Sequence, residues 1–382
     1  DALEELANAT YGDDPLTRFI PKYGNFDDPK RVARMQKAIA VIQLKLEGQI
    51  VQRNPQYNMD DRNLLHKLNV EQGTVELDGT VYDLLDNYFP TIDMNDPYAL
   101  SAAEQACMDQ LRQLFMESAQ LWRHMSYLFQ QGDMYIKRDN HLIFHGCIPV
   151  EEDGSFQSFT IDGEAYKGEA LFDVFESAML RAWRKRDPKA LDLVWYLWTG
   201  PLSPLFGKDK MATFESYFIA EKSTHKEAKN PYYKLIHEAS FCQHIFTEFG
   251  VDPELGLLVN GHVPVNIEKG ESPIKNSGAA VTIDGAFSEA YGDKGYTLVL
   301  DADKTSIASL HHFESIEEAI TNGADIIPEL VDIKVFPKPR KVGDTRRGKV
   351  KQREVDTLAR LILAYEENVF AEGNRERRTE TY

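Results

Sequence analysis

Two short stretches decide how this chain is interpreted: His141-Leu-Ile-Phe-His145-Gly146-Cys-Ile-Pro149 and Leu258-Val-Asn260-Gly261-His262-Val-Pro264. In each, an apolar run predicts a buried strand, and the run ends near a histidine that has a glycine beside it. A strand end holds a side chain rigidly, and a neighbouring glycine lets a ligand or another backbone come close. Neutral imidazole is the commonest metal ligand among side chains. If the two strand ends meet, His145 and His262 form one half of a metal centre. Taken alone, each is more often a structural residue.

The bulk properties of the chain limit its class. A length of 382 residues allows a large core and predicts two structural units. No apolar run is long enough to cross a bilayer. The net charge of -18 argues against nucleic acid, whose phosphates need a basic protein surface. It leaves a small anionic substrate open, because a few cations or metal ions can reverse the sign inside a pocket.

The three cysteines, Cys107, Cys147 and Cys242, are far apart and show no CxxC spacing. They therefore predict neither a disulfide framework nor a zinc knuckle, and they are compatible with a reducing cytoplasm. Cys147 stands two residues from His145, which raises the options of a ligand or a nucleophile. A small buried hydrophobic residue is the reading that we favour.

Residues 1–132 are predicted to be mainly helical. Apolar residues recur at helical spacing over 31–52, and again over 101–131. Ser101 and Glu104 have the spacing of a capping box at the start of the second helix. Between the two helices, residues 74–82 predict a small hairpin that turns at Asp78-Gly79.

Residues 133–333 alternate short apolar strands with helices, which predicts an α/β unit. The expected strands are 142–144, 257–259, 280–283 and 296–300. The expected helices are 170–186 and 232–249, and a shorter one is expected over 315–322.

Residues 334–382 begin with a basic arm at 338–353, followed by an amphipathic helix around Val355 to Tyr365 and a charged tail. A basic arm is unusual in so acidic a chain. It is suited to binding an anionic effector, to docking on the acidic helical region or to bridging subunits, although a solvated tail is the default for such a charge run.

Several uncommon sequence words occur in a fixed order and carry a resemblance to a known family. They are Tyr11-Gly-Asp-Asp-Pro, Asn87-Tyr-Phe-Pro-Thr-Ile-Asp93, the two histidine stretches quoted above, Lys269-Gly-Glu-Ser-Pro-Ile-Lys275, and Ile283-Asp284-Gly-Ala-Phe-Ser288 with Tyr291 beyond it. Over essentially its whole length the sequence resembles the class III (Firmicutes-type) fructose-1,6-bisphosphatases. These belong to the calcineurin-like metallophosphoesterase superfamily.

The resemblance implies a fold and a missing part. The superfamily has the ordered motifs D-x-H, G-D-x-x-D-R and G-N-H before two late histidine motifs, and only the late motifs occur here. The chain therefore resembles the C-terminal part of the enzyme, an α/β unit from a β-sandwich flanked by helices, with residues 1–132 as a helical insertion. We expect it to need an N-terminal segment of the same enzyme for stability, because later strands alone would leave a sheet edge uncovered. A homo-oligomer is also expected.

The implied chemistry is two-metal hydrolysis of fructose 1,6-bisphosphate to fructose 6-phosphate and phosphate, a reaction of gluconeogenesis, in the cytoplasm. The resemblance places His145 and His262 on the second metal and suggests Mn²⁺. It provides no catalytic acid within this chain. A phosphoprotein phosphatase with the same chemistry, and a non-catalytic regulatory or structural module, remain as alternatives.

Phosphate-binding and site-lining residues are also suggested by the resemblance. Lys208 or Lys210 stands where related phosphatases have an arginine, although a lysine offers a point charge rather than a bidentate fork. The alternative is a solvated loop with two exposed lysines. Lys275 is a further candidate for a sugar phosphate, and Asp284 and Tyr291 are expected to line the site.

The other histidines are expected to be structural. His141 is interpreted as a surface residue or as one that supports a ligand from behind. His237 and His244 are predicted to share one face of a helix surface. The pair His311-His312 is placed at a turn before the short helix at 315–322.

Overall fold

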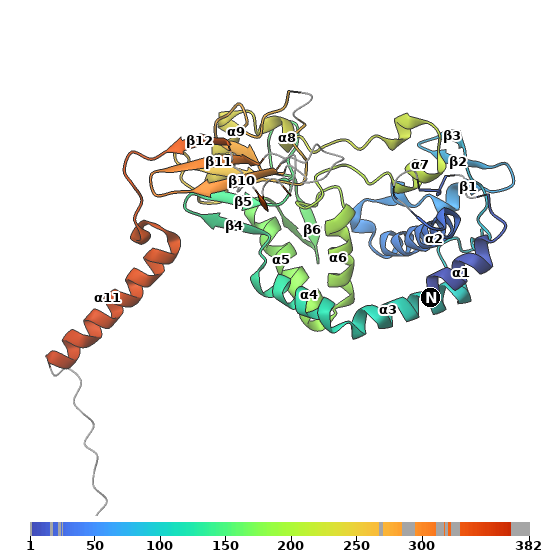
Figure 1. The fold of residues 1–382 in the computed structure, drawn as a ribbon, viewed down its shortest axis with the longest axis horizontal. Helices are drawn as coiled ribbons and strands as arrows, with labels where there is room; N and C mark the ends of the chain where they lie inside the picture. The colour runs from blue at the N-terminus through green and yellow to red at the C-terminus, as the bar shows by residue number, and fades with distance from the viewer. Residues whose placement is uncertain are drawn as a thin grey trace, which may run out of the picture. The chain divides into compact units, whose positions relative to one another are not determined.

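The computed structural model describes residues 2–15, 18–21, 24, 26–266, 270–284, 295–310, 317, 320–321 and 329–367, without the side chains of residues 310 and 346. It divides into two compact units (Figure 1). Unit 1 comprises Asp1–Tyr135 and Phe144–His237, and unit 2 comprises Ile136–Ile143 and Glu238–Tyr382. No helix of the described residues is long and apolar enough to cross a membrane.

Unit 1 is organised around the long helix α2 (Pro29–Arg53), which confirms the helix predicted over 31–52. Asp28 caps it by accepting a hydrogen bond from the Arg31 amide at 3.0 Å, and Pro29 occupies the first turn, where its missing N–H costs nothing. One hydrophobic cluster joins α2 to α1 (Ala2–Tyr11), to α7 (Thr213–Phe218) and to the small sheet β1 (Leu68–Asn69), β2 (Thr74–Leu77) and β3 (Thr80–Asp83).

The predicted hairpin is confirmed, because β2 and β3 pair antiparallel across Asp78-Gly79. Both turn residues have positive φ, at 49° and 77°, as a type I′ turn requires.

Two lysines of α2 are fully buried, which the sequence pattern did not predict. The Lys37 ammonium forms ion pairs with Asp14 and Asp86. The Lys45 Nζ donates to Glu104 Oε2 at 2.8 Å and to the Thr91 carbonyl at 2.6 Å. Because each lysine contacts distant segments, these charges tie the chain before and after α2 to the helix.

The helix predicted over 101–131 is wrong in one respect, because it breaks into α3 (Ala102–Glu117) and α4 (Ala119–Gln131). The expected capping box at Ser101 and Glu104 is confirmed. At the break, Ser118 ends α3 and caps α4 by accepting a hydrogen bond from the Leu121 amide at 3.3 Å. Serine favours such caps over helix interiors. The helix therefore breaks at Ser118 although the apolar spacing continues across it.

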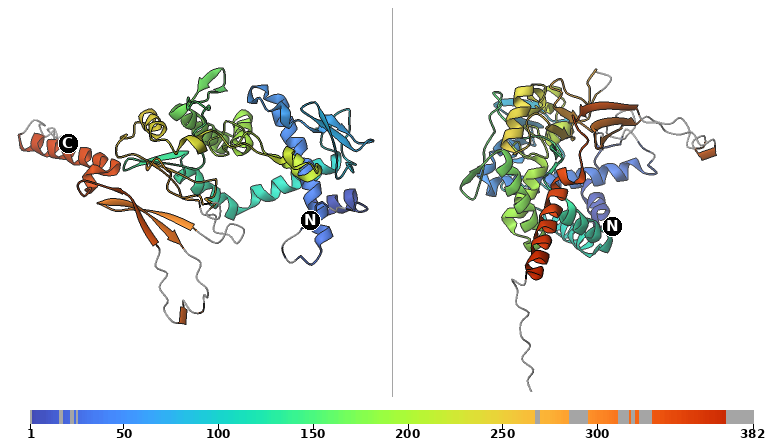
Figure 2. Two further views of the ribbon diagram at one scale, coloured as in Figure 1. Left: turned by 90° about the horizontal axis from the view of Figure 1, so that it is seen from above. Right: turned by 90° about the vertical axis from the view of Figure 1, so that its left-hand side faces the viewer.

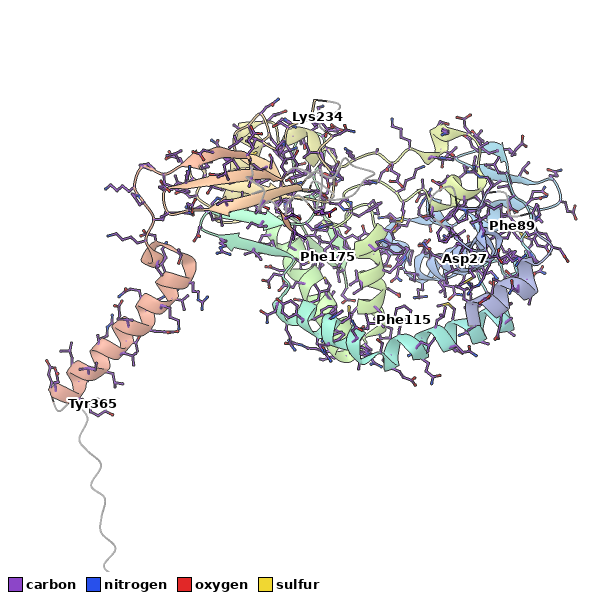
Figure 3. All side chains as sticks on the ribbon, viewed as in Figure 1. Asp27, Phe89, Phe115, Phe175, Lys234 and Tyr365 are labelled. Carbon is purple, nitrogen blue, oxygen red and sulfur yellow. The ribbon has the colours of Figure 1, made fainter. Side chains whose placement is uncertain are left out.

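Two further helices of unit 1 pack together around an aromatic cluster. Helix α5 (Gly168–Lys185) confirms the helix predicted over 170–186, and α6 (Pro188–Thr199) follows it. Phe159, Phe175 and Tyr196 stack between them, and Phe175 is marked in Figure 3. The remaining elements of unit 1 are β6 (Phe159–Ile161), β7 (Glu164–Tyr166), α8 (Tyr232–Leu235) and the short 3-10 helices η1 (Pro55–Tyr57), η2 (Asp60–Arg62), η3 (Leu65–Lys67) and η4 (Lys222–His225).

Unit 2 contains two sheets. The first has the order β4 (Tyr135–Arg138), β5 (His141–Phe144), β8 (Leu257–Asn260) and β9 (Ala280–Thr282), and β8 is parallel to both β5 and β9. The second is the antiparallel sheet β10 (Gly295–Leu300), β11 (Lys304–Leu310) and β12 (Glu329–Val335), seen from two further sides in Figure 2. All four predicted strands are thus confirmed.

The two sheets share a core. Leu257, Val259 and Val281 of the first sheet are fully buried, and Leu298 of β10 and Ile333 of β12 pack against them. This arrangement confirms the predicted α/β class. The assignment to a metallophosphoesterase sandwich stays a prediction.

The remaining helices of unit 2 correct two expectations. The helix predicted over 232–249 is interrupted between Leu235, where α8 ends, and Ala239, where α9 (Ala239–Glu248) begins; Glu238 in this break has an extended backbone. The basic arm is half helical, because α11 (Arg346–Glu366) begins inside it, after η7 (Val342–Asp344). Thr345 caps α11 by accepting a hydrogen bond from the Gly348 amide at 2.9 Å. The lysines and arginines that follow have a high helix propensity. The helix expected over 315–322, with His311 and His312, lies largely outside the described residues.

Candidate functional site

His262 stands directly after the carboxyl end of β8, as expected. Its φ of 65° lies in the left-handed region, which is uncommon for residues other than glycine and is found at functional sites as well as in turns. Two hydrogen bonds fix the carboxyl end of β8. The buried Asn260 side chain accepts a hydrogen bond from the Thr282 hydroxyl at 3.1 Å, and the Asn260 carbonyl accepts one from the Ile283 amide at 2.9 Å.

The loops after β8 and β9 lie side by side within unit 2. The Val265 amide donates to the Asp284 carbonyl at 3.2 Å, so the predicted residues His262 and Asp284 belong to neighbouring loops. Parallel strands place their carboxyl ends at one edge of a sheet, where ligands of α/β proteins bind.

Lys275 lies on the segment that pairs with β9. Its amide donates to the Ala280 carbonyl at 2.9 Å, and its Nζ donates to the Ser272 carbonyl at 3.2 Å. Tyr291 and Lys269 lie outside the described residues.

His145 follows β5 and belongs to unit 1, where its side chain is exposed. The glycine beside it has a packing reason, because a Cβ on Gly146 would stand 2.5 Å from the Pro204 carbonyl oxygen. The Cys147 amide donates to the same oxygen at 2.9 Å. Cys147 is fully buried, and burial raises the pKa of its thiol, which agrees with the favoured reading of a small hydrophobic residue.

His145 and His262 belong to different units, and the structure describes each within its own unit. Their approach to one metal therefore stays a prediction. Among the described residues, no group of three or more His, Cys, Asp and Glu side chains is arranged to hold a metal ion. Two imidazoles are fewer ligands than a catalytic metal takes from its protein. The described residues of this chain thus do not fit a complete metal centre by themselves.

Lys208 and Lys210 are partly buried and paired, so the alternative of two exposed, solvated lysines is wrong. The Lys208 Nζ lies 2.7 Å from Glu227 Oε2. The Lys210 Nζ lies 3.9 Å from Glu215 Oε1, which also accepts a hydrogen bond from Arg62 at 2.9 Å. Such pairing favours a structural role, and the phosphate-binding role stays a prediction.

His141 is fully buried, so its interpretation as a surface residue is wrong. Its Nδ1 donates toward the carbonyls of Arg138 and Asp139 at 3.0 and 2.8 Å, and its Nε2 lies 3.0 Å from Thr305 Oγ1 on β11. A ring with Nδ1 as donor and Nε2 as acceptor is the neutral form. His141 therefore joins the two sheets of unit 2.

The predicted helix face shared by His237 and His244 is also wrong. His237 precedes the break at Glu238, and His244 lies on α9.

Acid is expected to destabilise unit 2 through His141. Burial, the largest cause, and the Arg340 cation lower the pKa of this imidazole below 6.5, although the two backbone carbonyls and Asp139 oppose them. The unfolded chain then binds the proton more readily, so stability is complete above the ordinary pKa and falls as the pH drops below it. Hydrogen exchange of the β8 amides, compared at several pH values, should show this fall. A His141→Gln variant should have a flatter pH dependence, and equal slopes in both proteins would contradict the expectation.

The comparisons with known proteins agree on one family. A family model described as Firmicute fructose-1,6-bisphosphatase matches residues 1–367. A relative from Clostridioides difficile, named fructose-1,6-bisphosphatase class 3, is 43% identical over 97% of this chain and 58% of its own length. Relatives of the same name from Alkaliphilus metalliredigens and Fusobacterium nucleatum are 44% and 43% identical, over 95% and 93% of this chain and 57% and 56% of theirs. The chain thus spans a little over half the length of these relatives. No solved structure matches it significantly.

Proposed function

Because this chain belongs to the Firmicute fructose-1,6-bisphosphatase family, we propose that it contributes to a metal-dependent phosphatase that converts fructose 1,6-bisphosphate to fructose 6-phosphate and phosphate. The match over residues 1–367 carries the proposal. In this reaction, bound divalent ions supply an activated hydroxide and offset the charge on the transferred phosphoryl group.

His145 and His262 are the proposed metal ligands of this chain, with Mn²⁺ as the proposed ion. Two observations support His262: its place after a parallel strand and its left-handed backbone. His145 has the matching place after β5 and an exposed imidazole. The motifs that carry the other ligands of the superfamily do not occur in the 382 residues. We therefore propose that those ligands come from residues outside this stretch.

The proposed work of the chain's other residues is to hold the substrate. Lys275 supplies a positive charge for a sugar phosphate, and Asp284 lies on the loop beside His262. The buried amide of Asn260 keeps the ends of β8 and β9 together, which fixes the direction of the His262 imidazole. We propose that Lys208 and Lys210 contact phosphate only when bound substrate has displaced their carboxylate partners.

A substrate comparison tests the proposed function. The protein in its natural length is treated with a chelator, supplied with Mn²⁺, and assayed for phosphate release. We expect Mn²⁺-dependent release of one phosphate from each fructose 1,6-bisphosphate, and little release from a phosphopeptide. Faster release from the phosphopeptide would favour a phosphoprotein phosphatase. Absence of release from both would favour a non-catalytic module.

A further inference from the structure

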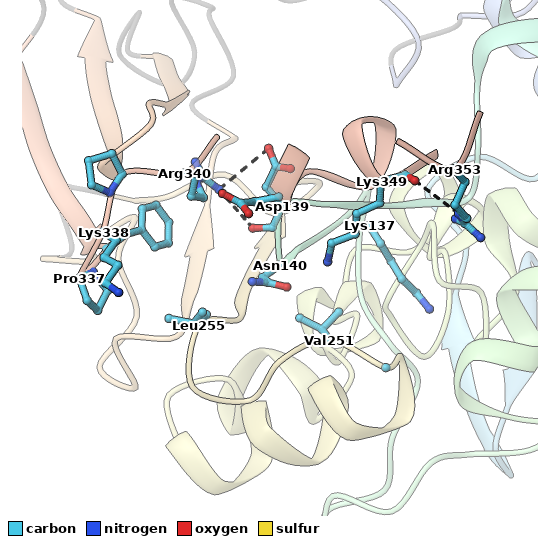
Figure 4. Close-up of a pocket in the computed structure, with 14 residues that line it drawn as sticks. Lys137, Asp139, Asn140, Val251, Leu255, Pro337, Lys338, Arg340, Lys349 and Arg353 are labelled. Atoms are coloured by element: carbon cyan, nitrogen blue, oxygen red, sulfur yellow. Dashed lines mark hydrogen bonds and ion pairs between the residues drawn. The ribbon is translucent and has the colours of Figure 1, made fainter. Parts of the chain in front are cut away.

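A pocket of about 640 Å³ lies in unit 2, where four segments of the chain converge (Figure 4). The first is the end of β4 with the turn after it, which provides Lys137, Asp139 and Asn140. The second is the segment 250–255 before β8, and the third is the segment 336–340 after β12. The fourth follows the third closely and comprises Asp344 and the first part of α11. We call it the basic pocket. It uses none of the residues proposed above for the metal or the substrate.

The pocket concentrates positive charge in an acidic chain. Five of its lining residues are cationic and two are acidic, whereas the whole chain has a net charge of -18. The acidic side chains are already engaged. Asp344 Oδ2 accepts a hydrogen bond from the Lys341 amide at 2.7 Å, and Asp139 Oδ2 lies 3.9 Å from Arg340 Nη1. The cations are Lys137, Lys338, Arg340, Lys349 and Arg353.

Three of these cations have no counter-charge among the described residues. Within the described part of the chain, the side chains of Lys338, Lys349 and Arg353 make no ion pair with a carboxylate, although the Arg353 Nε donates to the Lys349 carbonyl at 3.4 Å. Cations gathered around a hollow without matching carboxylates repel one another, and an anion in the hollow relieves that repulsion.

One wall of the pocket is rigid. The Arg340 Nη2 donates to the Asp301 carbonyl at 2.6 Å, and its guanidinium lies 4.2 Å from the ring centroid of Phe336. The amides of Arg340 and Phe336 donate to the carbonyls of Ala302 and Asp303 at 2.6 and 2.7 Å. The segment 336–340 is thereby fixed to the turn between β10 and β11, and the site is preorganised.

A tight turn continues the lining beside this wall, where the Arg340 Nη1 donates to the Asp139 carbonyl at 3.4 Å. Asp139 and Asn140 both have positive φ, at 52° and 66°, and the buried ring of His141 donates toward the carbonyls of Arg138 and Asp139. The Asn140 carbonyl accepts a hydrogen bond from the Leu257 amide at 3.2 Å, which ties the turn to β8.

The lining combines charge with an apolar surface. In Figure 4, Lys338 and Arg340 lie on one side of the pocket and Lys137, Lys349 and Arg353 on the other, with Leu255 and Val251 below. Lysine and arginine are the usual partners of phosphate groups. A volume of about 640 Å³ is typical of sites for small organic molecules and exceeds what one phosphate ion fills.

We propose that the basic pocket binds a small phosphorylated organic molecule, whose phosphate is held by the cations and whose uncharged part covers Val251 and Leu255. The five cations of the pocket, which come from three separate segments, and its apolar floor carry this proposal. It does not depend on the proposed function.

Calorimetry with phenylphosphonate, a phosphate-like anion that a phosphatase does not hydrolyse, tests the proposal on the protein in its natural length. The test variant is Lys349→Gln/Arg353→Gln. The matched control is Arg347→Gln/Lys351→Gln, which removes the same charge from α11 outside the pocket. We expect the Kd to rise at least tenfold in the test variant and less than twofold in the control. A single Lys338→Gln variant, on the other wall, should also weaken binding severalfold.

Several outcomes would overturn the proposal. Equal weakening in the test and control variants would indicate only general attraction to a basic helix. If inorganic phosphate binds as tightly as phenylphosphonate, the apolar floor makes no contribution to binding, contrary to the proposal. A His262→Gly variant that loses phenylphosphonate binding would place the ligand elsewhere. The thermal transition of each variant is measured as a control for folding. Midpoints within a few degrees of the parent would show that the changes act on binding rather than on folding.

Discussion

A protein in which glycine replaces His262 is expected to lose its metal-dependent phosphatase activity and keep its fold. We expect kcat/KM to fall by about a thousandfold, or about 4 kcal/mol of transition-state stabilisation, because one metal ligand is gone. The free energy of unfolding should stay within about 1 kcal/mol of the parent. Glycine adopts a φ of 65° without strain, which offsets the greater freedom that it gives the unfolded chain.

A large loss of activity with nearly unchanged stability distinguishes a metal ligand from a structural residue. Activity is measured with fructose 1,6-bisphosphate over a range of Mn²⁺ concentrations, and stability by urea unfolding. His244→Ala is the control, because this histidine lies exposed on α9 and not at a strand end. His262→Gly with more than a tenth of the parent's activity, or with a collapse of stability in place of activity, would show that the residue is structural.

Replacement of Lys37 by methionine is expected to destabilise unit 1 by about 3 to 5 kcal/mol. Methionine fills a similar volume, so the loss comes from charge and not from a cavity. The change would leave the carboxylates of Asp14 and Asp86, which are 1% and 10% exposed, without their shared cation. The rings of Tyr11 and Tyr88, which lie 5.1 and 5.4 Å from the Lys37 ammonium, would also lose a cation–π contact.

Tryptophan fluorescence during urea unfolding measures this loss of stability, because it reports on unit 1, to which Lys37 belongs. All four tryptophans lie between residues 122 and 198, within unit 1. Lys30→Met is the control, because Lys30 is exposed on the same helix, and its effect should stay within about 0.5 kcal/mol. A Lys37→Met protein that unfolds at the same urea concentration as this control would refute a stabilising role for the buried charge.

Local signals in the sequence predicted much of the fold. Apolar periodicity located α2, α5 and the strands β5, β8, β9 and β10, and Asp78-Gly79 located a hairpin. The breaks at Ser118 and Glu238 were missed, because the apolar pattern continues across both and only the capping geometry stops the helix.

Charges that are buried by distant partners were not predictable. A lysine at position 37 of an amphipathic helix reads as a solvent-facing residue. Only folding brings Asp14 and Asp86 to it from before and after the helix. The charge of the basic arm is evident from the sequence alone, but the residues that it meets are not. Its meeting with the turn at Lys137 depends on contacts across some two hundred positions, which no local pattern encodes.

For the candidate site, the sequence located the two histidines and their strands. It did not predict the left-handed backbone at His262, because only a few per cent of residues other than glycine adopt it, and a modest preference of histidine does not single out one position. Nor did it predict that Lys208 and Lys210 have carboxylate partners, which come from other segments of unit 1.

Each unit is built from two separate stretches of the chain, so no single cut in the sequence separates the two units. A truncated product that stops at His237 would retain the hairpin Ile136–Ile143 but lose β8, against which β5 pairs. A product that starts at Glu238 would lack the hairpin and present the bare edge of β8, whose Leu257, Leu258 and Val259 are all fully buried in the intact chain. Open, apolar strand edges recruit other strands, so both products should aggregate on expression. A soluble version of unit 2 requires a covalent graft that returns residues 136–143 to the front of β8, in the manner of a circular permutant.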